Sequence, residues 1–156
     1  MSGEDTPFTG TFPVRLPIWW GYRGAPGPHP DLDDVSGRIV VLRLPKTLKR
    51  LDRWMLRLFG GSSEIRRPLD ALNSLLWELS NGSRTFEEIC SHLDATFAED
   101  VAPVRARSQA AILQMASLGY MTSLSEPFTG KWSIGPGKDP SGELPELPQD
   151  AGLDIG

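Results

Sequence analysis

Cysteine and histidine are scarce in this sequence, which has one Cys and two His among its 156 residues. A single thiol, Cys90, excludes an internal disulfide and a cysteine-based zinc site. Cys90 and His92 form at most a two-ligand fragment, and His29 lies in another part of the chain. We therefore interpret Cys90 as a small buried thiol beside a histidine on a helix face, and expect no metal and no cofactor.

Long apolar runs are also missing, and none approaches the length of a membrane-spanning helix. The first ten residues, MSGEDTPFTG, are acidic and lack the charged-then-apolar order of a signal peptide. We therefore expect a cytoplasmic protein.

Signatures of catalysis are missing as well. The sequence contains no phosphate loop, no metal cluster, no pair of carboxylates in an apolar setting and no nucleophile with an ordered base. We therefore expect a protein that is not an enzyme.

Proline and glycine, in contrast, are abundant, with 14 and 16 residues, and are expected to mark segments outside the core. Charge divides the chain too: residues 1–34 have two basic and five acidic side chains, residues 35–125 twelve and nine, and residues 126–156 two and six. We predict a Pro-rich N-terminal arm (1–34), one domain (35–124) and an acidic, Pro/Gly-rich C-terminal tail (125–156).

The N-terminal arm combines prolines with many apolar residues. Prolines at 13, 17, 26, 28 and 30 exclude a helix and disfavour a central strand. The segment is nevertheless too apolar for a disordered tail, with Val14, Leu16, Ile18, Trp19, Trp20 and Tyr22. Two interpretations stay open: an extended arm that covers an apolar patch of the domain, or an exposed partner-binding anchor at Trp19 and Trp20.

The C-terminal tail has five acids and four prolines from residue 136 onward, so we expect disorder beyond about residue 135. The tetrapeptide PFTG occurs at 7–10 and again at 127–130. The repeat is either chance or a sign that both arms make similar turns and dock near each other.

The central domain has readable secondary structure. Residues 37–45 predict a strand, about 46–60 an inserted basic amphipathic helix, and 63–69 a short extended segment. Three helices follow, with Asp70, Thr85 and Asp100 as N-caps, and 120–124 is a last short strand. We therefore predict an α+β fold: a winged-helix-like domain with a small antiparallel sheet and a three-helix bundle, an extra amphipathic helix and irregular terminal arms. The expected helical core is Leu72, Leu75, Leu76, Leu79, Phe86, Ile89, Cys90, Leu93, Val104, Ala111, Ile112, Met115 and Leu118.

The stretch LLWELSNGSRTFEEI, residues 75–89, predicts a tight corner between two helices. Asn81-Gly82 is a stop signal for the first helix. Thr85 and Glu88 have the spacing of a capping box, in which each side chain satisfies a free backbone N–H at the start of the second helix.

This segment and its surroundings resemble the PqqD-like family, whose members are also called RiPP recognition elements. The resemblance rests on a strand leading into a Leu-rich helix, the Asn-Gly turn, the RTFEEI segment at 84–89, Phe97 in the spacer, and Gly119-Tyr120-Met121 after the third helix. It covers about residues 37–124 and is clearest over 63–121. The basic helix and the two arms are additions to the family pattern.

The resemblance implies a non-catalytic function. Such domains bind the leader segment of a precursor peptide and present it to a modifying enzyme, a radical SAM enzyme being one candidate. In the family, the leader adds as a strand beside the strand that precedes the first helix and rests against the third helix. Mapped onto this sequence, the peptide-binding residues are Ser63, Glu64, Ile65, Arg66 and Arg67 on the strand, and Arg105, Ser108, Gln109 and Ile112 on the helix.

Elementary geometry agrees with this mapping. An exposed strand edge offers N–H and C=O groups to an extended peptide. Arg66 and Arg67 are expected on opposite faces of the strand, so at least one can meet an acidic peptide residue. The alternative is that the arm 12–24, or another part of the chain, already covers this edge.

Two other functions were weighed. Duplex DNA binding needs a basic recognition helix, but residues 68–125 have three basic and seven acidic side chains, which argues against nucleic acid. The inserted helix carries a basic face that fits an anionic membrane surface or an acidic partner, although a solvated face is the simpler interpretation. That face consists of Lys46, Lys49, Arg50, Arg53 and Arg57.

Overall fold

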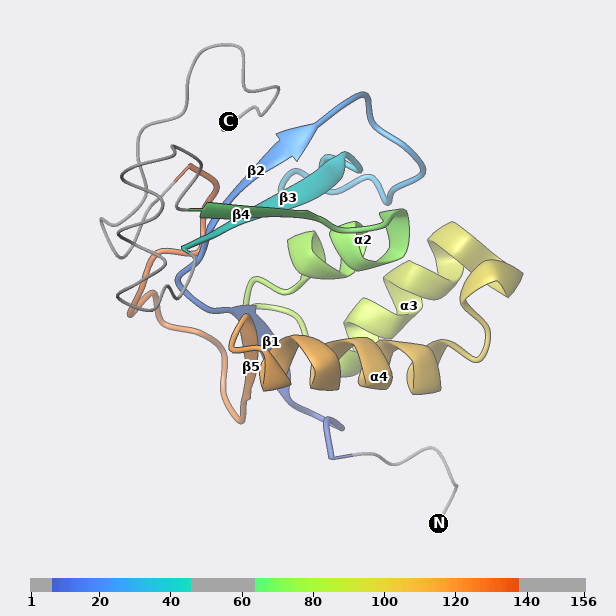
Figure 1. Cartoon of the computed structure of the whole chain (residues 1–156). Helices are drawn as coiled ribbons and strands as arrows, with labels where there is room; N and C mark the ends of the chain where they lie inside the picture. The colour runs from blue at the N-terminus through green and yellow to red at the C-terminus, as the bar shows by residue number, and fades with distance from the viewer. Residues whose placement is uncertain (1–6, 46–63, 138–156) are drawn as a thin grey trace, which may run out of the picture.

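The computed structural model describes residues 7–45 and 64–137, which form an α+β fold with two small antiparallel sheets and three α-helices (Figure 1). The predicted α+β class is confirmed. The inserted basic helix and its charged residues lie outside the described residues, as does the tail beyond residue 137. The strands are β1 (Phe12–Arg15), β2 (Trp19–Arg23), β3 (Ile39–Pro45), β4 (Glu64–Pro68) and β5 (Met121–Leu124), and the helices are α2 (Ala71–Leu79), α3 (Phe86–Phe97), the 3-10 helix η1 (Ala98–Val101) and α4 (Val104–Ser117).

The N-terminal arm supplies two of the five strands, so the expectation of an irregular arm is wrong for residues 12–23. β1 pairs with β5, and β2 pairs with β3. β2 is an edge strand of its sheet, a position that tolerates nearby prolines, and β1 also forms a bridge from Val14 to Asn81 on its other side. Trp19 and Trp20 are 7% and 2% exposed, so the covering arm is the correct interpretation and an exposed tryptophan anchor is wrong.

The three-stranded sheet has the order β2-β3-β4 and packs one face against the helices. Directly opposite residues share a face, so Trp20 and Leu42 point to the same side. The indole of Trp20 meets that of Trp77 on α2 edge to face, with ring centroids 6.0 Å apart. Figure 1 shows α2 between this sheet and the α3–α4 pair.

The first two helices begin as the sequence predicts. The Asp70 carboxylate accepts from the N–H of Asn73 at 2.7 Å. At α3, the Thr85 hydroxyl accepts from the N–H of Glu88, and the Glu88 carboxylate accepts from the N–H of Thr85. Both caps, including the capping box, are therefore confirmed.

The third helix departs from the prediction at both ends. Asp100 lies in η1, and the N-cap of α4 is Pro103, which makes no side-chain cap bond. A helical turn over 98–101 followed by extended Ala102 moves the start of the helix beyond the reach of Asp100. At the other end, Leu118 is the C-cap residue and is 46% exposed, so its placement in the core is wrong.

Both PFTG segments pack against the corner between α2 and α3, and residues 7–10 form a turn. The ring of Phe8 lies 5.8 Å from that of Phe86, and the N–H of Phe128 donates to the carbonyl of Gly82 at 2.9 Å. Gly82 has φ +81°, and a Cβ there would clash with Phe128, so only glycine fits this corner. Both segments thus contact the same corner, but the expectation of similar turns is wrong because residues 127–130 form no turn.

Candidate functional site

β4 is the end strand of its sheet within the part of the chain that the structure describes. β3 pairs with one side of it, from Val41 opposite Pro68 to Pro45 opposite Glu64. The arm 12–24 pairs with β5 and with the far side of β3. The alternative in which this arm covers the β4 edge is therefore wrong.

The main-chain groups of β4 alternate between β3 and the outer edge. The N–H of Leu69 donates to the carbonyl of Val40 at 2.8 Å, which fixes the hydrogen-bonded pairs of the ladder. Every second residue of β4 bonds to β3, so Arg67 and Ile65, like Leu69, direct their N–H and C=O groups to β3. Arg66 lies between them and directs its N–H and C=O groups outward. Pro68 also falls on the outward phase, where its missing N–H costs no ladder bond.

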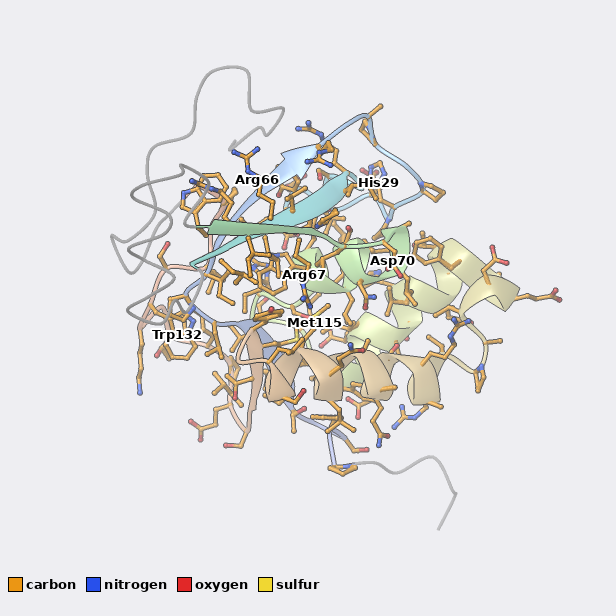
Figure 2. All side chains as sticks on the ribbon, in the orientation of Figure 1. His29, Arg66, Arg67, Asp70, Met115 and Trp132 are labelled. Carbon is orange, nitrogen blue, oxygen red and sulfur yellow. The ribbon has the colours of Figure 1, made fainter. Side chains whose placement is uncertain are left out.

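The side chains of β4 point to two faces, as predicted. Arg67 lies opposite the fully buried Leu42, so Arg67 and Ile65 lie on the helix-facing side of the sheet. Arg66 lies opposite Arg43 on the other side. Figure 2 shows Arg66 and Arg67 on opposite sides of the strand, with Arg67 on the side of α4.

Every side chain from Ile65 to Pro68 is exposed, and those of Ile65 and Arg67 share the helix-facing side. Ile65 is 43% exposed, which is unusual for a large apolar residue, and Arg67 is exposed beside it. Arg66 already makes an interaction. Ser63 lies outside the described residues, and Glu64 begins the strand.

The helix residues expected to line the site lie elsewhere. Ile112 is fully buried and Ser108 is 2% exposed, so both belong to the core. The guanidinium of Arg105 lies 5.4 Å from the Phe86 ring centroid and donates to Thr9 Oγ1 at 3.4 Å, which turns it toward the N-terminal arm. Gln109 is partly exposed. In this arrangement Ile112, Ser108 and Arg105 present no side chain to a peptide at β4.

A different flank of α4 faces the sheet. Figure 2 shows Met115 on the side of α4 turned toward β4. Ala111 and Leu118 share this flank, because they precede and follow Met115 by four and three positions. The spacing of these three residues is visible in the sequence, where it predicts only that they belong to the core.

The opposite edge of the sheet is covered by the chain itself. On β2 the ladder leaves the main-chain groups of Trp20 pointing outward, and the N–H of Gly137 donates to the Trp20 carbonyl at 2.9 Å. The Trp20 indole N–H in turn donates to the carbonyl of Ile134 at 3.0 Å. Strand addition along β2 is therefore obstructed at this point.

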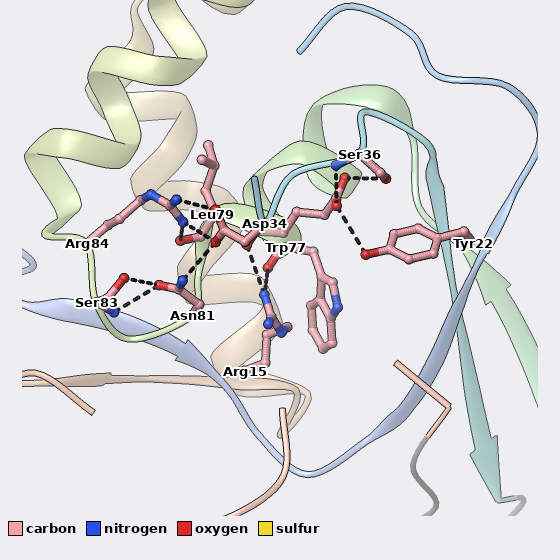
Figure 3. Close-up of polar contacts among 10 residues, drawn as sticks. Arg15, Tyr22, Asp34, Ser36, Trp77, Leu79, Asn81, Ser83 and Arg84 are labelled. Atoms are coloured by element: carbon pink, nitrogen blue, oxygen red, sulfur yellow. Dashed lines mark hydrogen bonds and ion pairs between the residues drawn. The ribbon is translucent and has the colours of Figure 1, made fainter. Parts of the chain in front are cut away.

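Arg15 of β1 joins three segments in the interior. Its guanidinium donates to the carbonyls of Trp77 and Glu78 at 2.7 and 3.0 Å, as Figure 3 shows for Trp77. It also donates to the carbonyl of Ile134 at 3.0 Å. Trp77 and Glu78 lie at the C-terminal end of α2, where the negative end of the helix dipole favours a cation, and the Trp77 carbonyl also accepts from the N–H of Ser80 at 3.2 Å. Burial lowers the pKa of Arg15 to about 10, so the guanidinium stays charged at neutral pH.

Glu78, 1% exposed, is a second buried hub. Its carboxylate accepts from the Tyr22 hydroxyl at 3.2 Å, from the hydroxyl and N–H of Ser36 at 3.1 and 2.8 Å, and from the N–H of Gly37 at 3.0 Å. Burial first, and then the charge of Glu78, raise the pKa of Tyr22 to about 12. Sequence reasoning missed this residue, although Glu78 follows Leu75 by three positions and so lies on the buried side.

An ion pair fastens the loop before β3 to the α2–α3 corner. Arg84 donates to both carboxylate oxygens of Asp34, at 2.6 and 2.9 Å, and Asn81 donates to the same carboxylate at 2.9 Å. The hydrogen bond from Arg84 holds the pKa of Asp34 below its usual value. These contacts, like those of Glu78, join segments that are far apart in the sequence and so hold the fold together.

Two hollows are lined by described residues that belong to neither β4 nor α4. One of about 340 Å³ is lined by residues such as Tyr22, Asp34 and Arg38, and one of about 250 Å³ by residues including Phe128 and Trp132. Among the described residues, no cluster of three or more His, Cys, Asp or Glu could hold a metal ion, and no helix is long and apolar enough to cross a membrane.

Comparison of the chain with protein-family models, with curated proteins and with solved structures finds no match.

Proposed function

We propose that this protein is a non-catalytic accessory protein of the cytoplasm that captures an extended peptide by strand addition to β4. In the PqqD-like interpretation, that peptide is the leader of a precursor, and the protein presents it to a modifying enzyme. The order of β3, β4, three helices and β5 fits a winged-helix-like domain, which the proposal assumes.

The observation that carries the proposal is the position of β4 at the end of its sheet. Among the described residues it has β3 as its strand partner, and Arg66 directs its N–H and C=O groups outward. An extended peptide could accept from and donate to these groups, as in other cases of strand addition. The exposed Ile65 and Arg67 beside them offer one apolar and one charged contact.

The contrast between the two edges supports β4 over β2. Gly137 occupies the outer side of β2 at Trp20, whereas β4 carries the exposed apolar side chain of Ile65. Where a protein covers a sheet edge with part of its own chain, that edge is protected from pairing with strands of other molecules. The proposal assigns the other edge to a ligand.

DNA binding is less well supported by the same structure. In a winged-helix reader, α4 would be the recognition helix and would contact phosphates through cationic side chains. Arg107 donates to the carbonyl of Asp100 at 2.7 Å, and Arg105 is turned to Phe86 and Thr9. Both of its basic residues thus make contacts within the chain.

The experiment is a titration with candidate leader peptides encoded beside the gene, against the wild type and two variants of Arg66. Arg66→Pro removes the outward N–H at a position where β3 loses no bond, and Arg66→Ala keeps that N–H but removes the side chain. We expect a dissociation constant below about 1 mM for wild type and Arg66→Ala. Loss of strand bonds should weaken binding to Arg66→Pro by about tenfold or more.

Three results would count against the proposal: equal binding by both variants, no binding of any nominated peptide, or tight binding of duplex DNA in parallel titrations. Circular dichroism of Arg66→Pro serves as the folding control, because an edge strand tolerates proline at an outward position.

A further inference from the structure

We propose that Arg67 selects an acidic residue in the bound peptide, and that this residue lies two positions before an apolar residue that packs on Ile65. The inference rests on the proposed strand addition and concerns the specificity of the same edge.

The phase decides which side chains meet the peptide most closely. Antiparallel neighbours alternate between hydrogen-bonded pairs and closer pairs without hydrogen bonds, whose Cα atoms are about 4.5 Å apart. Because Arg67 and Ile65 direct their main-chain groups to β3, both form the closer kind of pair with a strand added on the outer side. The side chains of Arg67 and Ile65 therefore contribute most to the selection of the peptide residues that lie opposite them.

The surroundings of Arg67 leave its charge available. It is exposed and has no hydrogen bond or ion pair among the described residues. The carboxylates on the nearby helix α2 and at its start are used elsewhere: Asp70 caps the helix, and Glu78 is buried and accepts four hydrogen bonds. A carboxylate supplied by a neighbouring strand would be the complementary group.

Strand direction fixes the order of the motif. Every pairing in this sheet is antiparallel, and we extend that pattern to the ligand. An antiparallel peptide read from its N-terminus passes Arg67 first, then Arg66, then Ile65. The recognised segment is thus an acidic residue, any residue, and an apolar residue, with the first and third on the helix-facing side, where the flank of α4 at Met115 lies.

The test is selection from a displayed library of random twelve-residue peptides on three proteins: wild type, Arg67→Glu and Arg23→Glu. Arg23 is an exposed arginine on β2, at the opposite edge of the sheet, so Arg23→Glu makes the same change of charge away from β4. Wild type and Arg23→Glu should enrich Asp or Glu two positions before an apolar residue. Arg67→Glu should enrich Lys or Arg at that position instead.

A synthetic copy of one selected peptide then measures how much its acidic residue contributes to affinity. Replacing its acidic residue by the amide should weaken binding to wild type by roughly two- to fivefold. The same replacement should leave binding to Arg67→Gln unchanged.

The outcomes separate this inference from the proposed function. If binders are recovered and lost with Arg66→Pro, but Arg67→Glu leaves their acidic residue enriched, strand addition stands and selection by Arg67 is overturned. A charge switch in the reverse order, apolar before acidic, overturns the antiparallel orientation. If no library member binds, or Arg66→Pro binds as well as wild type, both proposals fail.

Discussion

The guanidinium of Arg15 donates to the main-chain oxygen of Trp77 at 2.7 Å, which joins the N-terminal arm to the C-terminal end of α2. The two residues are 62 positions apart. α2 has no basic residue of its own in its last turn, so the arm supplies the cation that the terminal carbonyls favour. The arm is therefore part of the core that supports β3 and β4.

Arg15→Met should destabilise the fold strongly. The change keeps much of the side-chain volume but removes the donors to three main-chain carbonyls, two of them on the buried end of α2. We expect the free energy of unfolding in urea to fall by roughly 2–4 kcal/mol. Arg23→Met on the exposed end of β2 is the control, and an equal loss in both variants would contradict the role given to Arg15.

Alkaline pH should destabilise the protein through Tyr22. Its pKa is raised from 10 to about 12 in the folded state, so its contribution is complete below pH 10 and is lost as the pH rises through about 12. Urea unfolding between pH 9 and 12 should show this loss in wild type and a smaller one in Tyr22→Phe. At neutral pH, Tyr22→Phe should cost about 1–2 kcal/mol for the lost bond to Glu78.

The same change at Tyr120, between α4 and β5, controls for general effects of alkaline pH. If Tyr22→Phe and Tyr120→Phe flatten the alkaline branch equally, the special environment of Tyr22 is refuted.

Acid should weaken the attachment of the loop before β3. Arg84 lowers the pKa of Asp34 in the folded state, so the ion pair contributes stability above the unfolded pKa of about 3.9, and this is lost as the pH falls through the folded value. Asp34→Asn should cost roughly 1 kcal/mol at neutral pH and flatten the acid branch of the stability curve. Asp33→Asn, next in the chain and exposed, should leave that branch as it is in wild type.

Local chemistry was predictable from the sequence. Asp70, Thr85 and Glu88 form caps because their partners lie within three residues, and no tertiary contact competes for them. The tight corner at Gly82 follows from the same short-range reasoning. Asp100 failed as a cap because the chain forms a further helical turn before α4, which the pattern of apolar residues did not indicate.

Long-range pairing was not predictable in the same way. Whether Trp19 and Trp20 are buried depends on the pairing of β2 with β3 about twenty residues later, and the residue types alone fit both a covering arm and an exposed anchor. Burial of Arg15 and Glu78 depends on contacts across the fold, so both look like surface charges in the sequence.

For the candidate site, the sequence placed the strand but not the helix contacts. β4 lies where the extended segment 63–69 was expected, with Arg66 and Arg67 on opposite faces. The residues chosen on α4 were those of a family pattern. The arm, which is an addition to that pattern, engages Arg105, and Ile112 and Ser108 lie on the buried side of the helix.

Strand addition to β4 is tested most directly by intermolecular nuclear Overhauser effects between isotope-labelled protein and an unlabelled bound peptide. The close pairs without hydrogen bonds place the Hα of Ile65 and of Arg67 toward the added strand. We predict strong Hα–Hα contacts from the peptide to these two residues, spaced two peptide positions apart. Peptide contacts confined to β5, to α3 or to the hollow at Tyr22, with none to β4, would contradict the account.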